Sequence, residues 1–230
     1  RDQSVRRLGL TKFELGLFEQ SLVDEDAIPA LIRTPQYLAA GLEAQRKSIV
    51  LLNNKMADTA ALPLAEGTKI FVDGLDANEA KRYGTVVDSA DQADVVVLYL
   101  PTIFNGNQVP GSDELMDQFL STILPDDNLA FSPAVLNKAK GYSENALLIT
   151  VVDLNRPAIL TELNQLSDGL IGTFGVYDSV LFDVIFGQFS PQGKLPFEIP
   201  SSMAAVVAQQ EDMPDDSEKP VFEFGHGLSY

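Results

Sequence analysis

The sequence predicts an α/β fold: a three-layer sandwich with a mostly parallel sheet between helices, preceded by a helical linker segment. Apolar, strand-like runs alternate with helical stretches from about residue 67 onward, which is typical of parallel strands joined by crossover helices. The runs at 94–100 and 146–152 are almost unbroken in their apolar residues, as expected of strands covered on both faces. A hydrophobic content of 45% over 230 residues is sufficient for such a core.

Residues 1–48 are predicted to form the helical linker. Apolar side chains at helical spacing predict a helix over 6–20 and a second one over 36–47. Between them, residues 23–35 contain two prolines and are predicted to be irregular. The chain opens on a polar stretch without an initiator methionine, so we expect Arg1 to lie inside a longer protein.

Residues 49–230 are predicted to form the sandwich itself. An apolar stretch at 49–52 opens it, and the tail 201–230 reads as an acidic loop before a short last strand at 221–224. The other expected strands are 69–72, 85–87, 94–100, 146–152 and 169–174, and the expected helices are 77–83, 113–123, 133–140, 156–166 and 178–186. In such a sheet, ligands bind at the carboxyl ends of the parallel strands.

The composition excludes several classes of site. Without cysteine there is no disulfide, thiolate zinc site, iron–sulfur cluster or cysteine nucleophile, and His226 is the one histidine, so we expect no metal and no cofactor. A net charge of −17 disfavours a nucleic-acid partner, and no apolar run is long enough to span a membrane. Gly74 is not part of a phosphate-binding glycine pattern, which disfavours a nucleotide-binding domain.

Three segments form a distinctive set. They are 45–54 (QRKSIVLLNN) with 62–64 (LPL), then 181–187 (LFDVIFG) with 190–197 (SPQGKLPF) and 199–200 (IP), and finally 224–230 (FGHGLSY). Read in their order and spacing, they resemble the C-terminal half of family 3 glycoside hydrolases, a group of β-glucosidases, β-xylosidases and N-acetylglucosaminidases. Residues 12–19 (KFELGLFE) are similar to the stretch that follows the barrel of this family, so the resemblance covers nearly the whole chain.

The resemblance implies a composite active site. The family pairs a barrel, which carries an aspartate nucleophile, with an α/β sandwich that lends an acid/base residue. It implies retaining hydrolysis of terminal, non-reducing β-D-glycosides, with glucosides favoured, by two carboxyl groups about 5–5.5 Å apart. The partners would be a carbohydrate substrate and the chain's own N-terminal barrel, which this sequence lacks, so we expect the chain alone to be inactive. A periplasmic or secreted location is favoured over a cytoplasmic one.

The acid/base residue is the point at which this sequence departs from the family. Many relatives carry a glutamate in the loop after the strand that here ends at Leu100, but no glutamate stands near Asn105. Glu114 is the nearest glutamate in that connection and is our candidate acid/base residue. A structural alternative is that Ser112 caps a helix with Glu114 in its first turn. Two further alternatives remain: this member of the family has lost its activity, or its acid/base residue comes from the missing N-terminal half.

Tyr177 and Asp178 are the candidate substrate-binding residues. They end the loop 172–178, where relatives carry a glycine-rich turn near the site. Tyr177 could stack on a sugar face, and so could Phe174, although core packing is its default role. Asp73 and Asp153 end two expected strands and Arg156 begins an expected helix, and for all three we favour structural roles.

One alternative is a module that has the same fold but no catalytic activity. A catalytically degenerate module, either carbohydrate-binding or scaffolding, would retain the same framework after losing its acid, and the missing glutamate near Asn105 favours it. The sugar preference, the linkage and the oligomeric state are not encoded in any pattern that we recognise.

Overall fold

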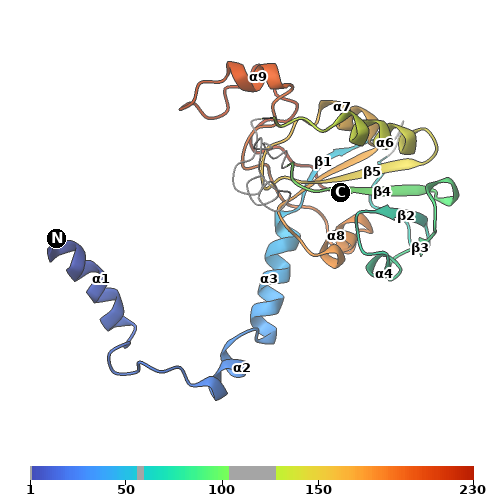
Figure 1. Ribbon diagram of the computed structural model, residues 1–230. Helices are drawn as coiled ribbons and strands as arrows, with labels where there is room; N and C mark the ends of the chain where they lie inside the picture. The colour runs from blue at the N-terminus through green and yellow to red at the C-terminus, as the bar shows by residue number, and fades with distance from the viewer. Residues whose placement is uncertain (1, 56–59, 104–127) are drawn as a thin grey trace, which may run out of the picture. The chain divides into compact units, whose positions relative to one another are not determined.

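The computed structural model describes residues 2–55, 60–103 and 128–230, and it divides the chain into two compact units, Arg1–Gly41 and Leu42–Tyr230. The expected helix at 113–123 lies outside the described residues. In Figure 1 the chain runs from blue helices at its start to a layered sheet and helices at its end.

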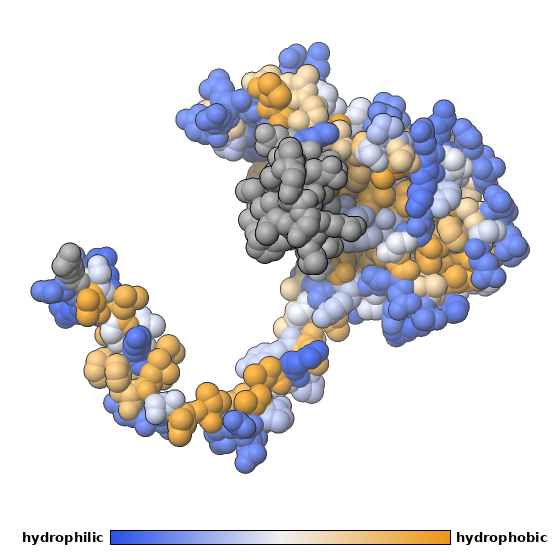
Figure 2. Space-filling view, viewed as in Figure 1, coloured by the Kyte–Doolittle hydropathy of each residue, from blue (hydrophilic) through white to orange (hydrophobic). Residues whose placement is uncertain are grey.

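The first unit consists of short helices that bury none of their side chains. Helix α1 covers Asp2–Glu14, a 3₁₀ turn covers Glu25–Ala27 and α2 covers Ile28–Leu31. Helix α1 ends earlier than its apolar pattern predicts, and Gly16 follows with a left-handed φ of +68°, a conformation common just past helix ends. Large apolar side chains are therefore exposed along this unit, as its orange surface in Figure 2 shows. They include Val5, Leu8, Leu10, Phe13, Leu15, Leu17, Phe18, Leu22, Val23, Leu31, Ile32, Tyr37 and Leu38.

The six described strands of the second unit form one sheet in the order β1-β6-β5-β4-β2-β3. All neighbouring strands are parallel except β1, which pairs antiparallel with β6 at the edge of the sheet. The strands are β1 (Val50–Asn54), β2 (Lys69–Asp73), β3 (Thr85–Val86), β4 (Val95–Leu100), β5 (Leu147–Asp153) and β6 (Gly169–Thr173). The predicted strands agree with these to within about a residue, except that β1 continues past 52 to Asn54.

Helices cover both faces of the sheet and complete the predicted three-layer sandwich (Figure 1). Helices α4 (Ala77–Ala80) and α8 (Asp178–Ile185) pack with Ile70, Val97 and Ile149 on one face. Helices α6 (Pro133–Ser143) and α7 (Thr161–Leu166) pack with Val96, Leu98 and Leu148 on the other. Successive residues of β4 thus point into different cores, which explains why its sequence is apolar at consecutive positions.

Several segments differ from the sequence-based expectation: residues 23–35, expected to be irregular, contain the 3₁₀ turn and α2, and the helix expected over 77–83 ends at Ala80 in α4. The predicted helix over 156–166 begins only at Thr161, because the chain before it is extended and Ile159 donates its amide to the Leu129 carbonyl. In the tail, the expected acidic loop contains helix α9 (Met203–Ala208), whose first turn is capped by Ser202. The strand expected at 221–224 is reduced to an isolated bridge between Ile199 and Phe222.

A buried carboxylate joins the helices of the α8 face. Asp183 lies in α8, and its Oδ2 accepts a hydrogen bond of 2.9 Å from Arg46 Nε and forms an ion pair with Arg46 Nη2 at 2.8 Å. Arg46 belongs to α3 (Pro35–Ser48), the helix that contains the boundary between the two units. The hydroxyl of Tyr83, which follows α4, donates to Asp183 Oδ1 at 2.7 Å. Both oxygens of this carboxylate are thus paired, as a buried charge requires.

The C-terminal segment packs closely against the start of the sandwich. Leu228 bridges to Leu51 of β1, and the Tyr230 hydroxyl donates to the Val184 carbonyl in α8. Gly193 lies against the backbone just before β1, where a Cβ atom would stand 2.5 Å from the Ile49 carbonyl oxygen. Close backbone approach therefore requires glycine at 193 and also at 227, whereas Gly225 has open space and instead adopts a left-handed φ of +77°.

We predict that Gly193→Ala destabilises the chain by about 2–3 kcal/mol, because rigid backbone would have to move away from the new methyl group. Gly41→Ala is the matched control: nothing lies within 4 Å of its Cβ position in α3, and alanine should stabilise this helix by about 0.5–1 kcal/mol. Urea unfolding midpoints measure both effects. A Gly193→Ala variant as stable as the parent would contradict the packing described.

We also predict a loss of stability at alkaline pH. Burial raises the pKa of Tyr83, Tyr142 and Tyr230 to about 12 each. For the first two, hydrogen bonds to Asp183 and Asp73 respectively are the second cause. Unfolded tyrosine has a pKa near 10, so the stabilisation is complete below about pH 10 and is lost as the pH rises to about 12. Tyrosinate absorbance and urea midpoints over this range test it. A single tyrosinate transition of the folded chain with its midpoint near pH 10 would refute it.

Candidate functional site

The parallel strands end along one side of the sheet, which we call the carboxyl edge. It is formed by the last residues of β2, β4, β5 and β6, namely Asp73, Leu100, Asp153 and Thr173. The register places Leu100 beside Val152, and Asp153 beside Thr173, so these ends are level with one another. This is the side on which a doubly wound sheet binds its ligands.

Asp153 is held in place by the turn that follows β5. Its Oδ1 accepts from the Asn155 amide at 3.1 Å, and its Oδ2 accepts from the Tyr99 hydroxyl at 3.3 Å. Thr102 donates to the Asp153 carbonyl and so attaches the chain after β4 to the end of β5. Only 9% of Asp153 is exposed. These contacts fit the structural role favoured for Asp153 from the sequence.

Asp73 anchors a helix in the same manner. Its Oδ2 lies 2.7 Å from Lys138 Nζ, and it accepts a hydrogen bond of 2.9 Å from the Tyr142 hydroxyl. Lys138 and Tyr142 both belong to α6. The carboxylate at the end of β2 is therefore engaged in attaching α6 to the sheet.

The loop after β6 brings Tyr177 and Asp178 to the carboxyl edge. Gly175 has a left-handed φ of +76°, which lets the chain turn sharply before α8. The Tyr177 side chain remains 64% exposed, whereas its backbone amide donates to Gln45 Oε1 at 2.8 Å. Asp178 Oδ2 accepts from the Asp76 amide at 2.7 Å, which joins the start of α8 to the loop after β2.

Tyr99 is a site residue that the sequence interpretation missed. Burial is the largest cause of the raised pKa of Tyr99. The negative charges of Asp153 and Asp178 raise this pKa further. Gly74 packs directly against Tyr99, since a Cβ atom there would meet the Tyr99 carbonyl oxygen at 2.9 Å. The available signal was a single hydroxyl-bearing residue within the otherwise aliphatic run VVVLYL.

The remaining sequence candidates have structural contacts or lie outside the described residues. Arg156 Nη1 donates to the Ile103 carbonyl at 3.4 Å, and Phe174 packs edge-on against Phe197 in the core. Glu114 falls within 104–127, outside the described residues, so its position relative to Tyr177 is not part of the structure. Among the described residues there is no group of three or more histidine, aspartate or glutamate side chains that could hold a metal ion.

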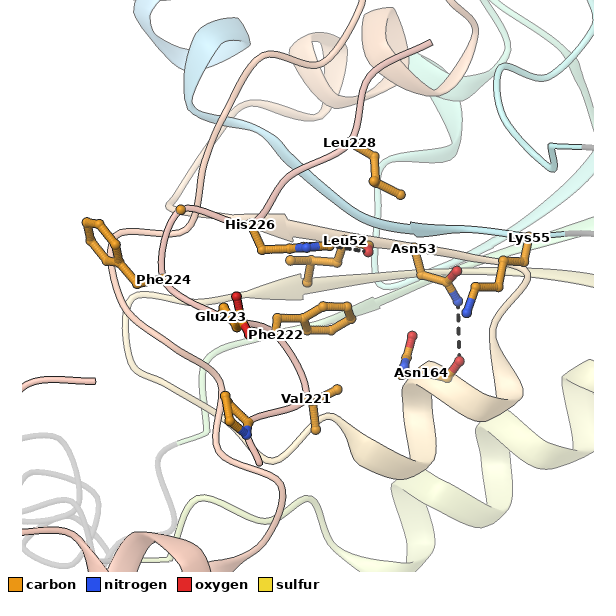
Figure 3. Close-up of a pocket in the computed structure, with 12 residues that line it drawn as sticks. Leu52, Asn53, Lys55, Asn164, Val221, Phe222, Glu223, Phe224, His226 and Leu228 are labelled. Atoms are coloured by element: carbon orange, nitrogen blue, oxygen red, sulfur yellow. Dashed lines mark hydrogen bonds between the residues drawn. The ribbon is translucent and has the colours of Figure 1, made fainter. Parts of the chain in front are cut away.

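A separate cavity of about 610 Å³ lies beside β1 and the C-terminal segment (Figure 3). Asn53 and Lys55 come from the end of β1, which runs antiparallel to β6 and so ends beside its first residue, Gly169. Asn53 donates to the Asn164 carbonyl, and His226 bonds the Leu52 carbonyl at 2.8 Å while packing on Phe222. The contacts of His226 are therefore structural, with the chain at β1 and with the C-terminal segment.

The family model of the glycosyl hydrolase family 3 C-terminal domain matches residues 82–230. A protein of Aspergillus flavus named "Probable beta-glucosidase C" is 36% identical over 230 residues, which are 100% of this chain and 35% of that protein. A "Periplasmic beta-glucosidase/beta-xylosidase" of Dickeya chrysanthemi is 34% identical over 233 residues, covering 100% of this chain and 34% of its own length.

Solved structures agree on the fold. The β-glucosidase of Listeria innocua, crystallised with glucose, superposes with a TM-score of 0.72 at 20% identity, over 95% of this chain and 37% of that one. The chain spans about a third of the length of the curated relatives that it matches. No helix among the described residues has the length and apolar character needed to cross a membrane. The family match over 82–230, together with the layered fold, shows that this chain belongs to the C-terminal domain family of the family 3 glycosyl hydrolases.

Proposed function

We propose that this chain is the C-terminal part of a retaining β-glycosidase that hydrolyses terminal, non-reducing β-D-glycosides, with glucosides preferred. The observation that carries the proposal is similarity over the whole chain to proteins named β-glucosidases, at 36% identity. In this proposal the chain contributes one wall of the active site, at the carboxyl edge of its sheet. Relatives from Dickeya chrysanthemi and Salmonella typhimurium are named periplasmic, which supports a periplasmic or secreted location.

The chemistry requires a second domain. Retaining hydrolysis uses one carboxyl group as nucleophile and a second as acid/base, about 5–5.5 Å apart. Asp73 and Asp153 are engaged in structural bonds, so neither is a candidate for attacking a sugar. We therefore assign the nucleophile to an upstream barrel, with residues 1–48 as the linker and residues 49–230 as the sandwich. The exposed apolar side chains of the first unit supply a surface that such a barrel would cover.

Tyr177 and Asp178 are the groups we propose to contact the sugar. An exposed aromatic ring can pack against the apolar face of a pyranose, and a carboxylate can accept its hydroxyl protons. Asp178 uses Oδ2 for the Asp76 amide, which leaves Oδ1 for a ligand. Two acids near Tyr99 make this part of the edge negatively charged, which suits a neutral, hydroxyl-rich substrate better than an anionic one.

The first test is hydrolysis of an aryl β-glucoside. We expect the full-length product of the gene to release the aglycone with retention of anomeric configuration, followed by NMR, and the purified 230-residue chain to show no turnover because it lacks a nucleophile. Turnover by the 230-residue chain would refute the composite site, and inversion would refute the double-displacement mechanism.

The second test concerns the acid/base residue, for which we propose Glu114. In the full-length protein, Glu114→Gln should reduce hydrolysis of substrates with poor leaving groups far more than of activated ones, because only the former need protonation of the leaving oxygen. Azide should restore turnover of the activated substrates. Asp113→Asn is the neighbouring control and should leave this dependence unchanged.

A Glu114→Gln variant that cleaves substrates with poor leaving groups as fast as the parent would exclude Glu114. If the full-length protein itself binds a β-glucoside without cleaving it, the degenerate carbohydrate-binding alternative is correct. The absence of glutamate near Asn105 is the observation that favours that alternative.

A further inference from the structure

The last turn of α3 contacts α8 at two places. Gln45 Oε1 accepts the Tyr177 amide at 2.8 Å, and the guanidinium of Arg46 forms a two-point pair with Asp183 at 2.9 and 2.8 Å. Tyr177 precedes the first residue of α8, and Asp183 lies near its other end. Two consecutive residues of one helix therefore hold both ends of another.

The Gln45 contact replaces a capping interaction that α8 cannot make by itself. In a capping box, a glutamate or glutamine at the third helical position binds the backbone amide of the N-cap residue. Tyr177 is the N-cap of α8 and makes no side-chain capping bond, and the third helical position is the buried Val180. Gln45 supplies the missing acceptor from a different helix.

The Arg46 contact fixes the body of α8. Asp183 is only 9% exposed, and its second oxygen is bound by Tyr83, whose ring packs between Phe182 and Phe186. Two guanidinium nitrogens contact Oδ2 while the Tyr83 hydroxyl holds Oδ1, so the carboxylate is fixed from two sides. The helix cannot rotate or slide without breaking this pair, so the positions of Tyr177 and Asp178 at its start are set by α3.

We propose that Gln45 and Arg46 are positioning residues for the sugar-contacting side chains Tyr177 and Asp178. The proposal rests on the function proposed above, because it assumes that Tyr177 meets a sugar. The hydrogen bond from the Tyr177 backbone amide to Gln45 holds the backbone that carries the exposed Tyr177 ring. Because the ring is ordered in advance, less conformational entropy is lost when a sugar binds.

The test uses three variants of the full-length protein. Gln45→Leu removes the acceptor at similar size and should raise KM for an aryl β-glucoside three- to tenfold with kcat little changed, as expected for loss of uniform binding. Gln45→Glu keeps an acceptor oxygen and should restore KM. Lys47→Gln is the matched control: it breaks the exposed pair with Glu43 in the same turn of α3 and should change nothing.

Two further measurements separate positioning from a general loss of structure. Amide hydrogen exchange of the peptide containing Tyr177 should accelerate in Gln45→Leu but not in Gln45→Glu or Lys47→Gln. The effects of Gln45→Leu and Tyr177→Ala on KM should be non-additive, because the first acts through the second. Arg46→Lys, which loses the two-point pair, should give a weaker form of the same change together with a lower unfolding midpoint.

The outcomes distinguish this inference from the proposed function. Faster exchange at Tyr177 with an unchanged KM, or fully additive effects in the double variant, would overturn the positioning role while the glycosidase assignment stands. If the full-length protein cleaves no glycoside, the proposed function fails, and the same variants are compared by calorimetric titration with cellobiose. Equal cellobiose affinity in Gln45→Leu and the parent would then overturn the inference as well.

Discussion

The requirement that a buried charge be paired governs the α8 side of this domain. The Asp183 carboxylate lies within an otherwise apolar layer, where an unpaired charge would cost several kcal/mol. Arg46 and Tyr83 satisfy it from two different elements, so α3, α8 and the chain after α4 can adopt only one mutual arrangement. Hydrophobic burial is non-directional, whereas the ion pair fixes the orientation of these elements relative to one another.

The same logic explains how the carboxyl edge is built. Parallel strands bring several acidic residues to one side of the sheet, and most of them are used to hold the structure. Asp73 binds α6 through Lys138 and Tyr142, and Asp153 closes the turn after β5. The start of α8 remains as the part of the edge with an exposed aromatic ring next to a carboxylate, and it is the part for which sugar contacts are proposed.

A domain of this kind is well suited to be one half of an active site. Its sheet is covered on both faces, so its scaffold is rigid, whereas its first unit exposes apolar side chains that it cannot bury alone. Retaining hydrolysis needs two carboxyl groups at a fixed short separation. In the proposed enzyme these two groups come from different domains. Helix α3 contains the boundary between the two units, and its last turn contacts the start of α8.

The sequence alone determined the layered α/β fold, the positions of the central strands and the family, because unbroken apolar runs and closely spaced glycine and proline motifs are local properties of the chain. Only the tertiary structure revealed that β1 is an antiparallel edge strand, that α9 interrupts the tail and that the Tyr99 hydroxyl binds Asp153. It also decided that Gln45 meets Tyr177 and Arg46 meets Asp183, which lie 132 and 137 residues apart. Periodicity reports which face of an element is buried, whereas the partner of a polar side chain depends on how the whole chain packs.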